Sequence, residues 1–264
     1  MRLNFPHRNT WLHHVNPSLK LMIMVGIFVG IILIHNPNIL LLITVSLVLV
    51  LTVWSGHPWK RLLLYTSPFL LIFISTSTGM MFFGRGETTW FRWGLIHITE
   101  ESFYRGIHLG LRALCMAASG LLFSLTTKPA ELFYSLMQQM RLPHKYAYSF
   151  LAGLRMVPIV FEEFMIRRQA LRIRGGPYKK GIARLYDSIH RYAIPLLAQS
   201  IRRAQRISVA MQAKRFLPGR KRTYYYKIGL GKEDAYMVLM FIIIFALSFA
   251  IGLAYPYMDS TDVR

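Results

Sequence analysis

The sequence predicts an all-α integral membrane protein with about five transmembrane helices and long cytoplasmic amphipathic helices. Three observations lead to this fold class. First, 54% of the 264 residues are hydrophobic, and they gather in five long runs. Second, the chain still carries a formal net charge of +21, a combination that is rare in one soluble domain. Third, an aromatic content of 14% excludes a disordered chain, because such a sequence would collapse.

The five apolar runs are each close to the length that a spanning helix needs, about 17–25 residues. The predicted spans are residues 19–35, 39–54, 62–83, 106–126 and 235–255. The turn Asn36-Pro37-Asn38 is short enough to make the first two spans a tight hairpin. The first run starts too late, and lacks the small-residue cleavage site, expected of a removed signal peptide.

These spans divide the chain into three predicted domains. Residues 1–140 form an N-terminal membrane domain with four spans, and residues 141–222 form a basic cytoplasmic module. Residues 223–264 hold the last span and a tail. The single cysteine, Cys115, excludes an intrachain disulfide.

The distribution of Lys and Arg predicts the orientation in the cell membrane, since cytoplasmic segments are enriched in them. Residues 141–222 contain 19 basic residues and only three acidic ones. With this segment inside, alternation places the loop 85–105, whose three arginines are balanced by three glutamates, outside. We therefore expect a cytoplasmic N-terminus and an external C-terminus.

The basic module is predicted to hold two long amphipathic helices, because its apolar residues recur at helical spacing. Pro158 should kink the first helix or mark a new start, and Gly175-Gly176-Pro177 should end it. The second helix is expected to stop near Leu217. The two apolar stripes are Phe150, Leu154, Val157, Phe161 and Phe164, and Ile194, Leu197, Ile201, Ala204, Ile207 and Met211.

Ionisable residues are few within the spans. Arg112 lies about two turns inside the fourth span, and we interpret it as an interfacial anchor that reaches the outer surface rather than as part of a substrate path. The spans contain no string of Asp, Glu or His that would relay protons or cations, which argues against a self-sufficient secondary transporter.

Motifs for catalysis or metal binding are not recognisable. The nearest candidate for a phosphate-binding loop, around Lys232, has Glu233 where Ser or Thr should follow. Histidines 7, 13 and 14 lack the spacing of a metal site, so interfacial positions are the preferred interpretation. No cofactor is expected on this chain.

Both cytoplasmic helices end in basic residues, the first at Arg172-Ile-Arg174-Gly175 and the second at Ala213-Lys214-Arg215. Cations are favoured at a helix C-terminus by the helix dipole, which is sufficient reason for them in a purely structural role. The functional interpretation is that each end presents a cation to an acidic groove on a cytoplasmic partner.

The chain resembles the T component (EcfT/CbiQ-like) of energy-coupling factor (ECF) ABC transporters over about two thirds of its length. The resemblance rests on the two helix ends, on the run from Leu154 through Gly175, on Ile194-Pro-Leu-Leu197 with Ile201-Arg-Arg-Ala204, and on Leu12-His-His-Val-Asn-Pro17 before the first span.

The resemblance implies that Ile173-Arg174-Gly175 and Ala213-Lys214-Arg215 stand for the family's Ala-Arg-Gly motifs, whose arginines dock into grooves of two ABC ATPase subunits. The second motif departs from this pattern, since Lys214 lacks the bidentate guanidinium and Arg215 replaces the glycine that most easily adopts a left-handed ending. Either Lys214 or Arg215 can make the second contact. Supporting charges are expected at Arg155, Glu162, Glu163, Arg172 and Arg206.

The expected function is therefore a non-enzymatic coupling subunit of an importer. Two ATPase subunits would bind ATP and Mg²⁺, and a small membrane S component would bind the cargo, a vitamin or precursor such as a thiamine-type pyrimidine. One alternative is an integral membrane enzyme acting on lipid or prenyl phosphates, although Glu162-Glu163 is a poor substitute for its acidic metal clusters. Nucleic-acid binding by the basic module is disfavoured by the regular apolar stripes.

Overall fold

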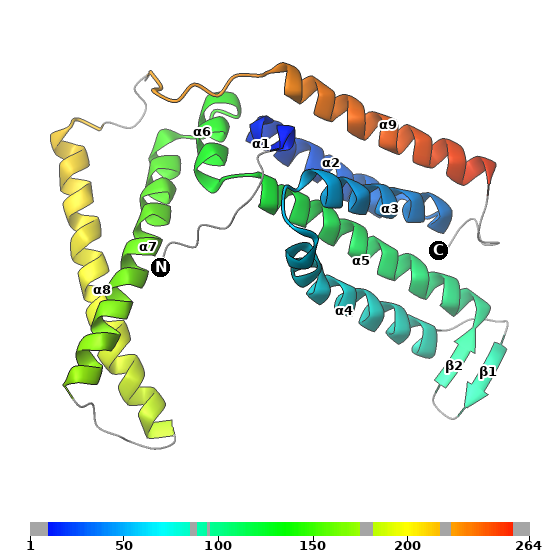
Figure 1. Ribbon diagram of the computed structural model, residues 1–264, viewed down its shortest axis with the longest axis horizontal. Coiled ribbons are helices and arrows are strands. Elements are labelled where there is room, and N and C mark those ends of the chain that lie inside the picture. Colours follow the sequence, from blue (N-terminus) through cyan, green and yellow to red (C-terminus); the bar gives the residue numbers. More distant parts are fainter. Residues whose placement is uncertain (1–9, 85–88, 94–95, 175–181, 217–222, 256–264) are drawn as a thin grey trace. The chain divides into compact units, whose positions relative to one another are not determined.

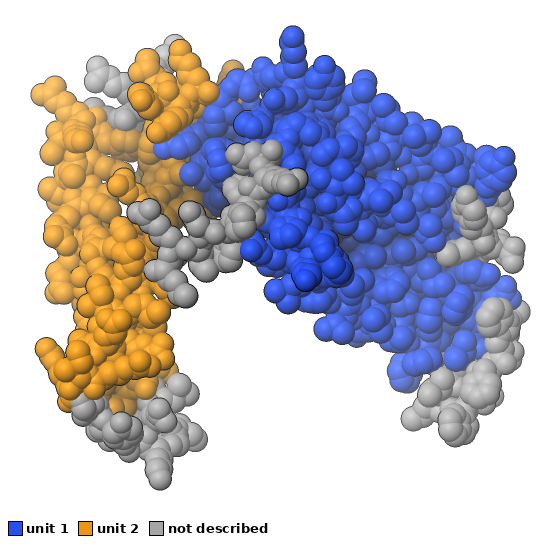
Figure 2. All heavy atoms as spheres, in the orientation of Figure 1, with its two compact units in different colours: residues 1–135, 228–264 blue, residues 136–227 orange. Residues whose placement is uncertain are grey.

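The computed structural model describes residues 10–84, 89–93, 96–174, 182–216 and 223–255. The chain folds into two compact units, which Figure 2 distinguishes by colour. Unit 1 comprises residues 1–135 and 228–264, and unit 2 comprises residues 136–227. Unit 2 is thus inserted into unit 1 and joined to it by two chain connections.

Unit 1 is a bundle of apolar helices (Figure 1). In chain order its described elements are α1 (Trp11–His14), α2 (Pro17–Leu33), α3 (Pro37–Trp54), α4 (Trp59–Phe83), β1 (Thr89–Trp93), β2 (Ile96–Thr99), α5 (Glu100–Thr126) and α9 (Lys232–Ala254), with α6 (Pro129–Gln139) beginning in this unit. Among the described residues, α3, α4, α5 and α9 are long and apolar enough to cross a membrane. Helix α2 is apolar too, and its 17 residues lie at the short end of the spanning range. The predicted all-α membrane fold is confirmed.

Helices α2 and α3 begin in the same way, with an asparagine followed by a proline. The side chain of Asn16 accepts a hydrogen bond from the Ser18 amide (3.1 Å), and that of Asn36 accepts one from the Asn38 amide (2.9 Å). The proline that follows each asparagine lacks the N–H that a first helical residue leaves unpaired. These two N-caps explain why both helices start where they do.

Glycines allow close packing in the interior of unit 1. Helix α5 packs against α4 through Gly106 and Gly110, where an added Cβ would lie 2.7 Å from the Ser77 carbonyl oxygen and 2.9 Å from the Phe73 ring, respectively. Small residues four apart are a common way to bring membrane helices together. Helix α3 packs between α5 and α9, and contributes a large share of the core.

Two features of unit 1 add to the sequence-based expectation. The loop 85–105 contains an antiparallel hairpin, in which Thr89 pairs with Thr99 and Trp93 with Ile96. In α5, Arg112 is half-buried and donates a hydrogen bond to the carbonyl of Ile34, the C-cap residue of α2 (3.2 Å). The guanidinium therefore caps a neighbouring helix end, where a cation is favoured by the helix dipole.

Unit 2 consists of the end of α6 and two long helices, α7 (His144–Ile173) and α8 (Ile182–Ala213), which run in opposite directions and cross (Figure 1). Pro158 lies inside α7 without ending it, so the prediction of a new start there is wrong. Helix α8 begins well before the predicted apolar stripe and ends at Ala213, a little earlier than expected.

Candidate functional site

The C-terminus of α7 presents an exposed cation. Arg174 is the C-cap residue, and its amide donates to the Ala170 carbonyl (3.1 Å), so the backbone is still held to the last turn. The preceding Ile173 is 87% exposed, which is unusual for a large apolar side chain and leaves it available to a partner. The predicted site residue Gly175 lies outside the described residues.

The C-terminus of α8 is closed by a Schellman motif. The Phe216 amide donates to the Met211 carbonyl and the Arg215 amide to the Gln212 carbonyl, both at 2.9 Å. Arg215 has a φ of +53°, the left-handed conformation that this motif requires at the first residue beyond the cap. Arginine therefore adopts the backbone conformation that glycine would take more easily, at a cost of roughly 1–2 kcal/mol.

Arg174 and Lys214 occupy equivalent positions. Each is exposed, and each follows directly after the last residue of its helix. The Lys214 amide bonds to the Ala210 carbonyl (3.1 Å), as the Arg174 amide does four residues back in α7. The alignment of helix ends thus pairs Lys214, rather than Arg215, with Arg174.

The two cations lie at opposite ends of the helix pair, because α7 and α8 are antiparallel. The Tyr148 ring near the start of α7 contacts Phe216 just beyond α8 (5.6 Å between centroids), and Phe164, further along α7, contacts Tyr192 in the first half of α8 (5.4 Å). With 30 residues in α7, the rise of 1.5 Å per residue separates its two ends by about 45 Å. Such a pair can contact two separate partners.

A polar brace holds α7 and α8 together where they cross. Glu163 forms an ion pair with Arg203 and accepts a hydrogen bond from Gln199 Nε2 (3.0 Å). The side chains of Glu163 and Arg203 are only 15% and 27% exposed, so water screens this ion pair less than a surface pair. We define the cross-helix brace as Glu163, Gln199 and Arg203.

The other supporting charges predicted from the sequence are exposed. They are Arg155, Glu162, Arg172 and Arg206. Sequence reasoning missed Gln199 and Arg203 as partners of Glu163. A signal for them existed, because residues 199 and 203 are four apart and project from the same side of a helix.

The apolar stripes of α7 and α8 are largely exposed in this chain. Six of their large side chains are between 50% and 64% exposed, namely Phe150, Val157, Phe161, Ile194, Leu197 and Ile201. An exposed apolar surface of this extent on a membrane protein is typical of contact with another protein or with lipid.

Within the described ranges, no group of three or more His, Cys, Asp or Glu side chains gathers as a metal site would require. Cys115 is fully buried in α5. The features with functional potential in the described part of unit 2 are therefore the two cationic helix ends, the brace between them and the exposed apolar stripes.

Comparisons with known proteins point to one family. The profile of the CbiQ family, "Cobalt transport protein", matches residues 8–225. The "Energy-coupling factor transporter transmembrane protein EcfT" of Streptococcus equi subsp. equi is 25% identical over 244 residues, 89% of this chain and 90% of that protein. The proteins of the same name from Brevibacillus brevis and Acidaminococcus fermentans are 25% and 26% identical, over 89% and 90% of this chain and 91% of each relative.

Proposed function

Because this chain belongs to the CbiQ family of cobalt transport proteins, we propose that it is the transmembrane coupling subunit of an ECF-type importer. Its relatives are ECF transporter transmembrane proteins by name, and they match it over nearly its full length. In this proposal two cytoplasmic ATPase subunits close on ATP, and unit 2 passes that motion to a small substrate-binding membrane protein, the S component.

The observation that carries the proposal is the placement of two exposed cations at the ends of two antiparallel helices. Arg174 would enter an acidic groove of one ATPase subunit and Lys214 that of the other. Lys214 is preferred to Arg215 as the second contact because it follows α8 as Arg174 follows α7. The brace at Glu163 would keep the two ends at a fixed spacing.

The exposed apolar stripes are the proposed contact for the S component. Phe150, Val157, Phe161 and their counterparts on α8 would pack against it at the inner edge of the bilayer. The cargo would then be chosen by that partner, and a vitamin or vitamin precursor is proposed, with a thiamine-type pyrimidine as the first compound to test. Cobalt, which the family description names, is the second.

Topology and cofactors follow from the same proposal. The basic unit 2 and the N-terminus lie in the cytoplasm, and the C-terminus lies outside the cell membrane, since 19 of the 32 Lys and Arg residues fall within 141–222. ATP and Mg²⁺ are bound by the ATPase subunits, and the chemistry of hydrolysis takes place on them.

A pull-down in mild detergent tests the proposal with the tagged wild-type chain and Arg174→Glu. We expect the wild type to recover ABC ATPases and a small membrane protein, and Arg174→Glu to lose the ATPases because the charge at the α7 end is reversed. Arg168→Glu, the same change at an exposed position inside α7, is the matched control and should retain them. Normal uptake by Arg174→Ala in cells would refute the coupling mechanism.

Lys214→Ala should weaken ATPase binding less than Arg174→Ala, because the neighbouring Arg215 supplies a second exposed cation. Titration of purified ATPases against each variant measures this difference. The double variant Lys214→Ala/Arg215→Ala should be as weak as Arg174→Ala. A double variant that binds like wild type would remove the α8 end from the proposed interface.

A further inference from the structure

A buried polar cluster joins the two chain connections through which unit 2 is inserted into unit 1. Ser135 is the last residue of unit 1 before the insertion, and Gly229 follows directly after the chain returns at residue 228. Asn16, at the start of α2, bonds to both. Its Oδ1 accepts a hydrogen bond from Ser135 Oγ (2.5 Å), and its Nδ2 donates to the Gly229 carbonyl (3.2 Å). One amide side chain therefore holds the outgoing and the returning segment together.

Further contacts fix this side chain in place. The backbone N–H of Asn16 donates a hydrogen bond to Asp234 Oδ1 (2.7 Å). The other carboxylate oxygen of Asp234 accepts one from the backbone N–H of Gly231 (2.8 Å). The Ser18 hydroxyl lies 2.6 Å from Ser135 Oγ. We define the junction cluster as Asn16, Ser18, Ser135, Gly229 and Asp234. The side chains of its four larger members are 0–5% exposed, so its hydrogen bonds form away from water.

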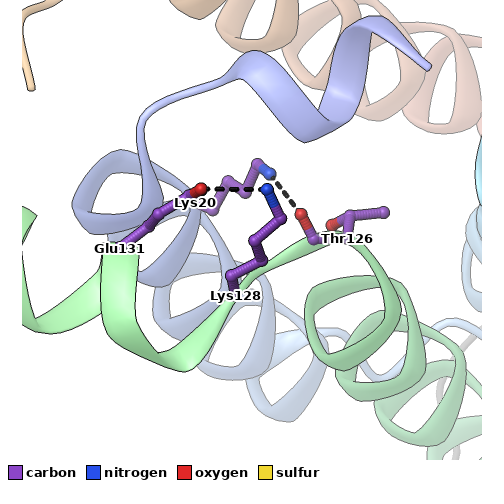
Figure 3. Close-up of polar contacts among 4 residues, drawn as sticks. All are labelled: Lys20, Thr126, Lys128 and Glu131. Carbon is purple, nitrogen blue, oxygen red and sulfur yellow. Dashed lines mark hydrogen bonds and ion pairs between the residues drawn. The ribbon is translucent and has the colours of Figure 1, made fainter. Parts of the chain in front are cut away.

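The end of α5 is tied to the same region by Lys20. Its Nζ donates to the carbonyl of Thr126, the last residue of α5 (3.0 Å), beside the Lys128–Glu131 ion pair (Figure 3). Lys20 is 3% exposed, and it is attracted electrostatically to Glu131 and Asp234. The cation therefore links α2 to the segment that leads towards unit 2.

The outgoing and returning segments are also joined on the unit 2 side. Gln138 Nε2 donates to the Tyr226 carbonyl (2.6 Å), and the ring of Tyr224 packs edge-on against His144 (5.6 Å between centroids). The two connections are thus linked at successive points, from the junction cluster to the start of α7. A displacement of one segment is passed to the other, since neither can move without breaking hydrogen bonds, of which the one between Asn16 and Ser135 is buried.

We propose that Asn16 is a positioning residue for energy coupling, which clamps both connections of unit 2 to the start of α2 so that motion of the cytoplasmic helices reaches the membrane helices as one displacement. This inference rests on the proposed coupling function. These two connections are the covalent links between the units, and the Asn16 side chain is hydrogen-bonded to both of them. Loss of the clamp should leave ATPase binding intact and lower the transport obtained for each ATP hydrolysed.

The matched control lies in the same chain. Asn36 precedes Pro37 as Asn16 precedes Pro17, and it caps α3 with the same type of side-chain bond (2.9 Å to the Asn38 amide). Asn36→Ala therefore removes an N-cap of the same kind, whereas Asn16→Ala removes the cap together with the clamp. The difference between the two variants isolates the contacts with Ser135 and Gly229.

The test uses the full chain with its copurified partners in liposomes, and measures cargo uptake and ATP hydrolysis in the same vesicles. Asn16→Ala should lower the ratio of uptake to ATP hydrolysed by about tenfold, with ATPase recovery in the pull-down unchanged. Asn36→Ala should stay within about twofold of wild type, because its cap has no part in the clamp. If Asn16→Ala does not accumulate, Ser135→Ala decides the question. It removes the contact of Asn16 with the outgoing segment and leaves the Asn16–Gly229 bond in place, so a smaller fall of about threefold is expected.

The inference is overturned if Asn16→Ala or the substitute Ser135→Ala keeps the wild-type ratio, or if Asn36→Ala lowers the ratio equally. Because the clamp acts as a unit, the double variant Asn16→Ala/Ser135→Ala should lower the ratio of uptake to ATP hydrolysed no further than Asn16→Ala alone. Fully additive losses in this ratio would also overturn the inference. Failure of the proposed function would look different: the wild-type chain itself would recover no ATPase and drive no uptake.

Discussion

The cross-helix brace makes a prediction that can be worked out from its contacts. Glu163→Gln keeps the shape of the side chain but removes the charge that Arg203 pairs with. The new amide nitrogen would also be buried where Glu163 Oε2 has no hydrogen-bond partner among the described residues. Hydrogen bonds to charged groups contribute about 1.5–3 kcal/mol and neutral ones about 0.5–1.5, so the change should cost about 1–1.5 kcal/mol of local stability.

Hydrogen–deuterium exchange measures this loss where it occurs. Local opening of α7 and α8 near their crossing exposes the backbone amides, and exchange speeds up in proportion to the opening constant. A loss of about 1–1.5 kcal/mol corresponds to exchange that is about 5- to 13-fold faster. Peptides that cover residues 160–166 and 196–204 should show it, whereas peptides of α3 in unit 1 should not.

Glu162→Gln is the matched control. It makes the same chemical change one residue away, at an exposed position that is not part of the brace. Exposed charges contribute little, so its exchange should remain within about twofold of wild type. If Glu163→Gln and Glu162→Gln change exchange equally, or if neither changes it, Glu163 does not hold the two helices together.

Two further predictions concern unit 1 and use the five tryptophans, all of which lie before residue 100, as a fluorescent report of unfolding in detergent. Lys20→Met should lower the Tm by about 5 °C, since a buried charged hydrogen bond to Thr126 is lost, whereas Lys128→Met, at an exposed ion pair, should change it little. An equal effect of both would contradict the buried role of Lys20. Gly106→Ala should lower the Tm by several degrees, because its Cβ would meet a backbone oxygen at 2.7 Å and force α4 away from α5. Gly120→Ala, with an ordinary 3.6 Å contact, should be neutral or slightly stabilising, and a stable Gly106→Ala variant would argue against this packing.

The fold class and the five apolar helices could be predicted because membrane spans are a local property of the sequence. An uninterrupted apolar run of sufficient length specifies a helix in the bilayer whatever surrounds it. The predicted span at residues 39–54 differs from α3 by two residues at its start, since Pro37 and the Asn36 cap set the boundary. The ends of α7 and α8 were also foreseeable, since Arg174 directly precedes the predicted end at Gly175 and Lys214 lies three residues before the predicted stop at Leu217.

Other features required the tertiary structure. The hairpin of β1 and β2 is short and has no apolar periodicity long enough to stand out from a loop. The role of Arg112 as an interfacial anchor stays a prediction. The structure adds its hydrogen bond to the Ile34 carbonyl at the end of α2 (3.2 Å), since no local pattern relates residue 112 to residue 34. The exposure of the apolar stripes was equally hidden, because periodicity shows that a helix has an apolar face and does not show what covers it.

The amino-acid sequence was sufficient to predict which segments are apolar enough to span a membrane, which segment carries the positive charge and where the cationic helix ends fall. Each of these depends on neighbours within one or two helical turns. The tertiary structure alone decided that Glu163 meets Arg203, and that Asn16 meets Ser135 and Gly229 across 119 and 213 residues of chain. Hydrogen bonds between distant residues form only when packing of the intervening helices brings them within about 3 Å, and that packing depends on the whole chain at once.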